Sequence, residues 1–532
     1  MAYINVNNIS DEVEREYSAS TPVEHRKKYA QFFTPPIIAD LMATWIIGNK
    51  KLEVVLEPAF GLGIFSRTLL NKKSGIIING FEVDKKIYQK SLDLYKNEKN
   101  ISIQFKDYMY NDWENKYDGI MCNPPYFKFH DYDNKNILNE IEEKTSYKLN
   151  GFTNLYALFL LKSIYQLNEN GRAAYIIPSE LLNSDYGKKV KKYLVETKTL
   201  RHVIIIDFEE NVFDGALTTA SILLFANDDE AASVQFHNIK NVTALHPIKK
   251  IIDEYPDNKT NLCSIKIEEL KPAIKWRAYY QEQNYKKYKH FVPFGTYGKV
   301  VRGIATGANE YFTFNPSKAK QFGINQKYLL PCICKSVDIK GSFFTEIEFE
   351  QLQKNNKHAL LLNAINPIDD SVRKYISIGE KDGIDKKFLT SHRNPWYALE
   401  NRLPAPILVS VFNRNGLRFI RNEAGISNLT TFHCMYINKY FIHKTDLLFA
   451  YLLTDISKEI FGDNRREYGN GLQKYEPNDI NGAKILDLEL IDSKIEKVIL
   501  QLFNSYRESV LNRQPNDNYI KEIETHLLKI FC

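Results

Sequence analysis

Short apolar runs alternate with amphipathic segments through the first half of this chain of 532 residues. The runs are predicted to be strands, and they lie at residues 52–56, 76–83, 101–105, 117–122, 173–177, 203–206 and 220–225. Predicted helices separate them: one begins near Ile64, one ends near Tyr95, and two span 154–167 and 184–195. Strands that alternate with helices are typical of a parallel, doubly wound sheet, so the sequence predicts an α/β fold.

The pattern becomes irregular after about Lys240. An isolated strand is predicted at 407–412, and helices are predicted at 446–461, 493–506 and 517–530. We therefore expect two domains, residues 1–240 and residues 241–532, with the boundary between Ala226 and Pro247. The second module is too large to serve only as a scaffold.

Composition excludes several classes of protein. The mean hydropathy is −0.38 and no apolar run reaches transmembrane length, so a membrane protein is not expected. Six scattered cysteines and the lack of a signal peptide predict a cytoplasmic location. A net charge of +6 is compatible with a polyanionic partner but does not establish one.

The tetrapeptide Asn123-Pro124-Pro125-Tyr126 directly follows the predicted strand 117–122. Two consecutive prolines remove two backbone donors and stiffen the local path. Ligands of open α/β sheets bind at the carboxyl ends of the strands, where this tetrapeptide lies. An amide, a backbone carbonyl and an aromatic face together suit a planar group that carries an NH2, such as a nucleobase.

Other predicted strand ends carry residues suited to a ligand. A glycine-containing turn at 57–63 allows close approach of the backbone, although it matches neither a dinucleotide-binding fingerprint nor a P-loop. Glu82 ends the second strand, where an acidic residue commonly bonds ribose hydroxyls. Asp107 and Tyr108 follow the third strand, where they suit an adenine amine and its ring. A tight turn or a solvated carboxylate explains each site alone, but together they line one edge of one sheet.

Tyr29 to Pro36 form a further motif upstream of the first strand. Thr34 is predicted to cap a helix that begins with Pro35 and runs to about Ile46. The segment is either a plain helix cap or a cover over the tail of a cofactor.

Five motifs in this order resemble a known family. They are Gln31-Phe32-Phe33-Thr34-Pro35-Pro36, Leu56-Glu57-Pro58-Ala59, Phe81-Glu82-Val83-Asp84, Asp107-Tyr108 and Asn123-Pro124-Pro125-Tyr126. The set resembles the gamma-class, TaqI-like DNA adenine-N6 methyltransferases of restriction–modification systems. The resemblance implies a Rossmann-like, S-adenosylmethionine-dependent methyltransferase domain with a mixed seven-stranded sheet, followed by a mixed α/β target-recognition domain. Residues 301–309 and 467–474 look similar to segments of that second domain.

The resemblance also implies the residues of the site. The cofactor-binding positions are Tyr29, Thr34, Glu57, Ala59, Gly61, Glu82, Asp107, Tyr108, Asn123 and Phe159. The catalytic positions are Asn123, Pro124, Pro125 and Tyr126, with Phe213 packing against the other side of a flipped base. The implied reaction is methyl transfer from S-adenosylmethionine to N6 of an adenine flipped out of double-stranded DNA. The implied enzyme is a bacterial monomer on DNA, and a cognate restriction endonuclease on a separate chain is a further candidate partner.

Several alternatives stay open at this point. The same tetrapeptide suits methylation of cytosine N4, of RNA or of a protein glutamine, and a DNA-binding specificity module without catalysis is a further reading. We expect no metal site, since Cys332-x-Cys334 lacks a second pair of ligands. Cations of the second half suit the base edges of DNA, but for any single cation a phosphate contact or a solvated surface is the stronger interpretation, so none is assigned to a particular base. They are Arg302, Arg393, Arg402, Arg414, Arg418, Arg421, Arg465, Arg466 and Lys474.

Overall fold

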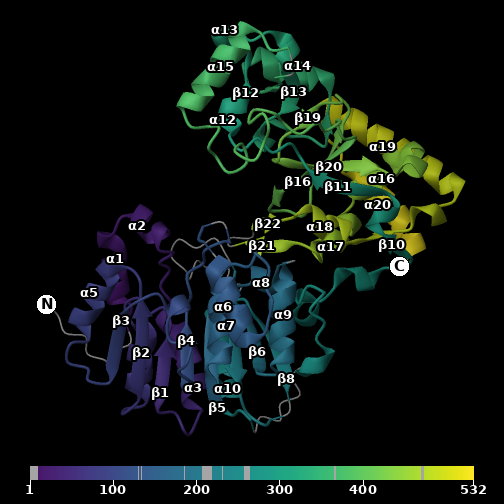
Figure 1. Ribbon diagram of the computed structural model, residues 1–532. Helices are drawn as coiled ribbons and strands as arrows, with labels where there is room; N and C mark the ends of the chain where they lie inside the picture. Colours follow the sequence, from purple (N-terminus) through teal and green to yellow (C-terminus); the bar gives the residue numbers. More distant parts are fainter. Residues whose placement is uncertain are drawn as a thin grey trace. The chain divides into compact units, whose positions relative to one another are not determined.

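The computed structural model of the chain divides into two compact units (Figure 1). It describes residues 10–129, 131–133, 135–184, 186–206, 219–230, 232–256, 264–364, 367–468 and 472–532. Unit 1 comprises Met1–Glu282 with Glu467–Gly471, and unit 2 comprises Gln283–Arg466 with Leu472–Cys532. In the described part of the chain, no helix is long and apolar enough to cross a membrane.

Unit 1 extends further along the chain than the expected boundary at residue 240. Strand β8 continues the large sheet next to β6, and β9 pairs with β8. Trp276 is buried in the same core as the first strands, and its backbone N–H donates to the carbonyl of Leu182. These contacts place the segment up to Glu282 with unit 1, because it covers surface that the sheet would otherwise expose.

A sheet of nine strands, counted over the described residues, forms the centre of unit 1 in the order β3-β2-β1-β4-β5-β7-β6-β8-β9. β7 runs antiparallel to both of its neighbours, and β9 is antiparallel to β8, while the other pairs are parallel. The first seven strands of this order are the predicted ones, so the mixed α/β expectation is confirmed, and β8 and β9 enlarge the sheet. The strands are β1 (Val54–Glu57), β2 (Ile77–Glu82), β3 (Ile101–Phe105), β4 (Tyr117–Cys122), β5 (Leu167–Pro178), β6 (Leu200–Ile206), β7 (Ala220–Ala226), β8 (Ser233–Ile239) and β9 (Ser264–Lys266).

Helices cover both faces of this sheet (Figure 1). Ala173 and Tyr175 of β5 pack into one core, whereas Ala174 and Ile176 pack into the other. Residues that point alternately to two dry faces must all be apolar, which explains the continuous apolar runs of the central strands. The helices are α1 (Glu12–Ser20), α2 (Val23–Lys28), α3 (Pro36–Ile47), α4 (Ile64–Lys72), α5 (Lys85–Leu94), α6 (Lys135–Thr145), α7 (Leu155–Tyr165), α8 (Glu180–Asn183), α9 (Gly187–Glu196), α10 (Leu245–Asp253) and α11 (Arg277–Tyr280).

Unit 2 is built on several smaller sheets. A five-stranded sheet has the order β11-β20-β16-β18-β14, and a four-stranded sheet has the order β12-β15-β13-β19. A short sheet, β17-β22-β21, and the pair β10-β23 complete the strands of the described residues, with Glu467 and Tyr468 of β21 counted in unit 1. The strands are β10 (Phe291–Pro293), β11 (Gly298–Arg302), β12 (Thr313–Phe314), β13 (Leu329–Ile333), β14 (Phe343–Phe344), β15 (Leu360–Leu362), β16 (Ile407–Ser410), β17 (Phe412–Asn413), β18 (Phe419–Asn422), β19 (Ser427–Asn428), β20 (Phe432–Ile437), β21 (Arg466–Tyr468), β22 (Leu472–Lys474) and β23 (Lys484–Leu486).

The helices of unit 2 match the predicted ones in part. The segment predicted as one helix at 446–461 is two helices, because Thr454 has extended backbone angles and caps the second one through its side chain. The predicted strand 407–412 is likewise two short strands that join different sheets. The helices are α12 (Asn309–Phe312), α13 (Pro316–Phe322), α14 (Glu346–Lys354), α15 (Asp370–Lys381), α16 (Thr445–Leu453), α17 (Asp455–Gly462), α18 (Pro477–Asn481), α19 (Ser493–Leu511) and α20 (Asn518–Phe531).

Candidate active site

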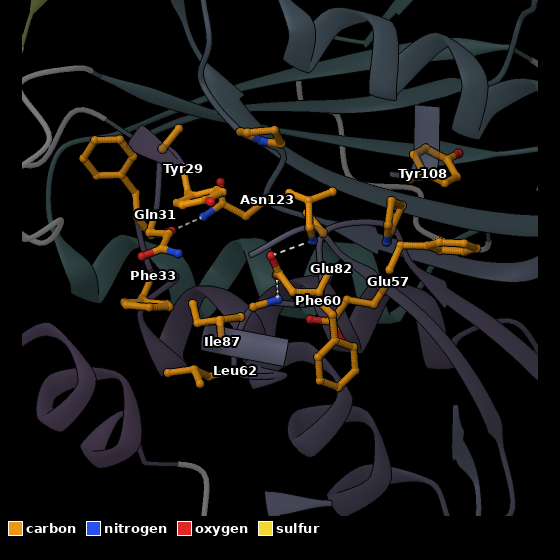
Figure 2. A pocket seen from close by; sticks show the side chains of 18 of the residues that line it. Tyr29, Gln31, Phe33, Glu57, Phe60, Leu62, Glu82, Ile87, Tyr108 and Asn123 are labelled. Carbon is orange, nitrogen blue, oxygen red and sulfur yellow. Dashed lines mark hydrogen bonds between the residues drawn. The ribbon is translucent and has the colours of Figure 1, made fainter. Parts of the chain in front are cut away.

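A pocket lies at the carboxyl ends of the first four strands of unit 1 (Figure 2). Glu57 ends β1 and Glu82 ends β2, while Asp107 and Asn123 follow β3 and β4. Because parallel strands end at the same edge of a sheet, four residues distant in sequence meet at one cavity. Every expected cofactor position lines this pocket: Tyr29, Thr34, Glu57, Ala59, Gly61, Glu82, Asp107, Tyr108, Asn123 and Phe159. Pro125 lines it as well, whereas Pro124 and Tyr126 are not among its lining residues.

Asn123 is oriented by the segment that precedes α3. Its Nδ2 donates to the carbonyl oxygen of Phe32 at 2.8 Å and to Oγ1 of Thr34 at 3.1 Å. The Phe32 carbonyl can only accept, so these contacts require the amide nitrogen on that side and turn Oδ1 the other way. The side chain therefore presents a preorganised acceptor at the pocket.

Thr34 differs in role from the predicted helix cap. Pro35 is the N-cap of α3 and Pro36 is its first residue, one position later than expected. Thr34 has a relative exposure of 2%, and its hydroxyl accepts the hydrogen bond from Asn123 instead of one from the helix. The expectation of a Thr34 cap was wrong, because proline has no N–H and two prolines fit the start of the helix without a side-chain cap.

Tyr126 belongs to a cluster of aromatic rings. Its hydroxyl donates to the carbonyl oxygen of Ile176 at 3.3 Å. The Phe32 ring lies nearly parallel to it, with ring centroids 6.0 Å apart and an angle of 21° between the planes. Tyr156 packs against it edge to face, also at 6.0 Å. These contacts fix the plane of the Tyr126 ring, which is half-buried.

Glu82 is held by backbone N–H groups. Its Oε1 accepts from Val83 at 2.9 Å and from Asp84 at 2.8 Å, and its Oε2 accepts from Gly61 at 3.0 Å. Burial raises the pKa of Glu82 to about 7, even though these three donors favour the ionised form. Gly61 has φ +54°, a left-handed conformation that suits glycine and turns its N–H toward the carboxylate.

Glu57 is a second buried carboxyl group of the pocket, with a relative exposure of 2%. Its Oε2 accepts from the backbone N–H of Ser66 at 3.1 Å and from the Ser66 hydroxyl. Burial raises the pKa of Glu57 to about 8, with hydrogen bonds from Ser66 and the charge of Arg67 acting in the opposite direction. A cationic ligand nearby would lower this pKa and favour the carboxylate.

Tyr108 lies at the far end of the pocket from Tyr29 and Gln31 (Figure 2), and the preceding residue, Asp107, also lines the pocket. The Asp107 carboxylate accepts from the backbone N–H of Met109 at 2.9 Å through Oδ1, and burial raises its pKa. The Tyr108 hydroxyl donates to Gln166 Oε1 at 2.5 Å, inside the protein core. The ring of Tyr108 packs against Phe159 with a centroid distance of 5.2 Å, and both residues line the pocket.

Several residues that line the pocket were not predicted from the sequence. Gln31 donates through Nε2 to Asp84 Oδ2 at 2.6 Å, and His25 contacts the same oxygen at 2.7 Å. Asp84 thus ties the segment before α3 to the end of β2. Gln31 and Asp84 each belong to one of the five motifs, but nothing in the sequence indicated that they form a hydrogen bond. The other missed residues include Glu14, Phe33, Leu62 and Ile87, whose apolar or helical setting carries no signal of a site.

Phe213 lies outside the described residues, so its expected place beside a base stays a prediction. Among the residues that the structure describes, no group of three or more His, Cys, Asp or Glu side chains is arranged to hold a metal ion.

Comparison with known proteins decides the family. Residues 16–281 match the family model "N-6 DNA Methylase", and residues 276–525 match "Type II methyltransferase M.Eco57I, C-terminal domain". The Type II methyltransferase M.AccI of Acinetobacter calcoaceticus is 59% identical over 97% of this chain and 96% of its own length. The chain belongs to the Type II DNA methyltransferases of the N6-adenine type.

More distant proteins resemble this methyltransferase over most of its length. The Type II methyltransferase M.XamI of Xanthomonas campestris pv. amaranthicola is 22% identical over 88% of the chain and 87% of its own length. A nuclease-deletion mutant of the Type ISP restriction–modification enzyme LlaGI, solved with a DNA substrate mimic, has a TM-score of 0.52. It is 11% identical, and the match covers 94% of the methyltransferase and 48% of that chain, so it supports the fold alone. The two family matches overlap at residues 276–281, directly before the boundary between the two units at Glu282.

Proposed function

We propose that this methyltransferase transfers a methyl group from S-adenosylmethionine to N6 of an adenine flipped out of double-stranded DNA. The geometry of Asn123 is the observation that carries the proposal. Hydrogen bonds to Phe32 and Thr34 hold its amide nitrogen, so the oxygen is fixed as an acceptor beside the pocket. An amine with two hydrogens is the group that such an acceptor suits.

The donors and acceptors of the pocket fit S-adenosylmethionine. Glu82, whose two oxygens are positioned by backbone N–H groups, would accept from ribose hydroxyls. Asp107 has one oxygen on Met109 and would accept the adenine amine with the other. Glu57 would face a positive charge, which favours its carboxylate form. Bound S-adenosylmethionine supplies an electrophilic methyl group on its sulfonium.

The chain's own residues would activate the acceptor nitrogen. The lone pair of adenine N6 is delocalised into the ring, so N6 is a poor nucleophile. Asn123 Oδ1 and the Pro124 carbonyl would each accept one N6 hydrogen and draw the nitrogen toward a tetrahedral shape, which localises the lone pair. Acceptors that are already in place need no reorganisation during the reaction. The N6 lone pair would form the bond to the methyl carbon as the carbon–sulfur bond breaks, with the electron pair left on sulfur as a neutral thioether, and the proton that N6 then loses would pass to water.

Tyr126 would bind the extruded base by stacking. Flipping a base costs a few kcal/mol, and stacking on an aromatic ring returns roughly 1–3 kcal/mol. The contacts to Phe32, Tyr156 and Ile176 hold the Tyr126 ring in one plane before the base arrives. Phe213 is proposed as the second aromatic contact.

The other expectations extend the proposal. Action on DNA places the enzyme in the bacterial cytoplasm, as a monomer on its duplex, and a restriction endonuclease on a separate chain is its proposed partner. Unit 1 is proposed as the catalytic domain and unit 2 as the target-recognition domain.

Methyl transfer from labelled S-adenosylmethionine to duplex DNA, RNA and protein acceptors tests the proposal. We expect label in DNA only, recovered as N6-methyladenine after nucleoside digestion. Asn123→Ala should abolish transfer while S-adenosylmethionine still binds. Label in N4-methylcytosine, RNA or protein glutamine, or turnover retained by Asn123→Ala, would contradict it.

A further inference from the structure

A cleft of unit 2 is lined by parts of both segments that resemble target-recognition sequences. Arg302, residues 305–310, Lys474 and Glu476 are among the residues that line this cavity of about 630 Å³. Arg302 ends β11 and pairs across the sheet with His433 of β20, while Lys474 of β22 pairs with Phe412 of β17. The cleft therefore lies where the five-stranded sheet meets the short sheet of unit 2.

Two cations in this cleft share one carboxylate. Arg302 contacts Glu476 Oε2 at 2.8 Å, and Lys474 contacts Glu476 Oε1 at 2.7 Å. Burial alone would raise the pKa of Glu476, but hydrogen bonds and charges from Lys474 and Arg302 lower it to about 2. The carboxylate therefore stays ionised, and Arg302, Lys474 and Glu476 together carry one net positive charge. The Arg302 side chain is 63% exposed, whereas Glu476 is 13% exposed, so the cation is the accessible partner.

Contacts at the start of α18 hold Glu476 in position. Its backbone N–H donates to Asp479 Oδ2 at 2.8 Å, and Arg466 holds the same oxygen at 2.7 Å. These contacts hold the backbone of Glu476 at the start of α18, so a cation that swings outward moves away from the carboxylate and can meet a competing anion. A phosphate is such an anion, because it accepts from arginine with the same two-oxygen geometry as a carboxylate.

The loop after β11 is held in place by Arg393, and exposed apolar groups also line the cleft. Arg393 donates to the backbone carbonyls of Ala305 and Thr306 and holds the loop after β11. Leu389 and Phe412 line the cleft with relative exposures of 41% and 54%. The Lys474 ammonium lies 5.5 Å from the centroid of the Phe412 ring. An exposed aromatic ring beside cations is typical of surfaces that bind nucleic acid.

His433 is a buried residue in the lining of this cleft. Its relative exposure is 2%, it lines the cleft, and its Nε2 bonds to the Tyr475 carbonyl at 2.7 Å. Its Nδ1 has no hydrogen-bond partner among the described residues.

We propose that this cleft contacts the DNA duplex through Arg302 and Lys474, which bind phosphates, and that Glu476 restrains binding to DNA of the wrong sequence. The inference rests on the proposed action on DNA. In the free protein, Glu476 neutralises part of the charge that would attract any duplex. On the correct site, further contacts compensate for separating the two cations from Glu476. A charge that opposes the wrong partner is a common source of specificity.

Binding assays at several salt concentrations test the proposal. The probes are a duplex that carries the site methylated by the wild-type enzyme, located by single-molecule sequencing, and a shuffled duplex of equal length. Arg302→Gln and Lys474→Gln should each weaken binding to both duplexes and reduce the salt dependence by about one phosphate contact. Glu476→Gln should tighten binding to the shuffled duplex roughly fivefold and reduce the ratio between the two affinities.

Two controls keep these outcomes interpretable. Glu350→Gln and Lys354→Gln alter an exposed pair on α14, outside the cleft lining, and should leave both affinities unchanged. In the double variant Arg302→Gln/Glu476→Gln, the gain from Glu476→Gln should shrink, because one of the released cations is gone. The affinity for S-adenosylmethionine and the melting temperature monitor folding in each variant.

The results also separate this inference from the proposed function. If the wild-type enzyme does not methylate DNA, the proposed function fails. If it methylates DNA but Arg302→Gln, Lys474→Gln and Glu476→Gln bind both duplexes as the wild type does at every salt concentration, only the role of the cleft is overturned.

Discussion

Replacement of Glu82 by glutamine separates the ligand-binding role of this carboxylate from its role in the fold. In the structure, Oε1 accepts from Val83 and Asp84, and Oε2 accepts from Gly61. A glutamine oxygen can keep the bonds to Val83 and Asp84. Its NH2 group then faces the N–H of Gly61, which loses its acceptor.

Two effects on stability oppose each other in this variant. An unpaired buried N–H at Gly61 costs about 1–3 kcal/mol. Burial raises the pKa of Glu82 from 4.5 to about 7, so the ionised carboxyl group costs about 3 kcal/mol at pH 8, from (7 − 4.5) × 1.36. Glutamine removes that cost. We therefore expect the free energy of unfolding at pH 8 to change by less than about 2 kcal/mol.

The affinity for S-adenosylmethionine should change much more. Hydrogen bonds from ribose hydroxyls to a carboxylate are worth about 1.5–3 kcal/mol, and an amide replaces a charged acceptor with a weaker one. A loss of about 2 kcal/mol corresponds to a Kd roughly 30-fold higher. Isothermal titration calorimetry at pH 8 measures this Kd directly. Glu24→Gln, at an exposed position of α2, is the matched control and should bind normally.

The pH dependence adds a second criterion. The ionised form of Glu82 is the better acceptor for hydroxyl donors, so the wild-type Kd should fall as pH rises from 6 to 8. Glu82→Gln should show a flatter profile, with a residual slope from Glu57, whose pKa is about 8. A folded Glu82→Gln protein with a Kd within threefold of wild type at pH 8 would refute the assignment of this carboxylate to the cofactor.

Three further predictions follow from single contacts. Thr34→Val removes one of the two acceptors that orient Asn123, so kcat should fall about fivefold, which corresponds to a loss of about 1 kcal/mol. Thr34→Ser keeps the hydroxyl and should have a kcat near that of the wild type. Equal losses of kcat in both variants would contradict the positioning role of Thr34. Tyr126→Ala should reduce the fluorescence rise of 2-aminopurine at the target position. Tyr126→Phe keeps the ring and loses only the hydrogen bond to Ile176, so it should retain the fluorescence rise. A loss of the rise in both variants would argue against stacking. Burial lowers the pKa of His237 from 6.5 to about 4, so its neutral form is required in the fold. The contribution of His237 to the free energy of unfolding should be complete above pH 6.5 and should fall by about 3 kcal/mol as the pH drops to 4. In urea titrations, the free energy of unfolding of His237→Gln should decline less steeply over this pH range. An unchanged decline would contradict the role of His237.

The fold of unit 1 was predictable where burial is strongest. Strands such as β5 and β7 have two covered faces, so their continuous apolar runs mark them in the sequence. β8 was missed because it is only partly buried and carries polar residues, including Gln235 and His237. β9 is short and exposed at the edge of the sheet. The domain boundary shifted from residue 240 to Glu282 for the same reason, since the sequence marks these strands only weakly.

The site was predictable where the chemistry lies in short motifs. Glu57, Glu82, Asp107 and Asn123 each stand at or directly after a recognisable strand, so their shared edge follows from a parallel sheet. Gln31 and Asp84, which form a hydrogen bond, are far apart in sequence, and Glu14 lies on a helix with no motif. Contacts of this kind depend on how helices pack, which local patterns do not encode.

The sequence by itself determined the family resemblance, the α/β class and the residues at the strand ends, because these depend on local apolar patterns and short motifs. Only the tertiary structure decided how those residues are used. It turned Thr34 from a helix cap into a partner of Asn123, and it fixed the direction of the Asn123 amide. It also brought Arg302 to Glu476 across 174 residues of chain. The direction of an amide and the pairing of distant charges are set by three-dimensional packing, since neighbours in space decide which donor meets which acceptor.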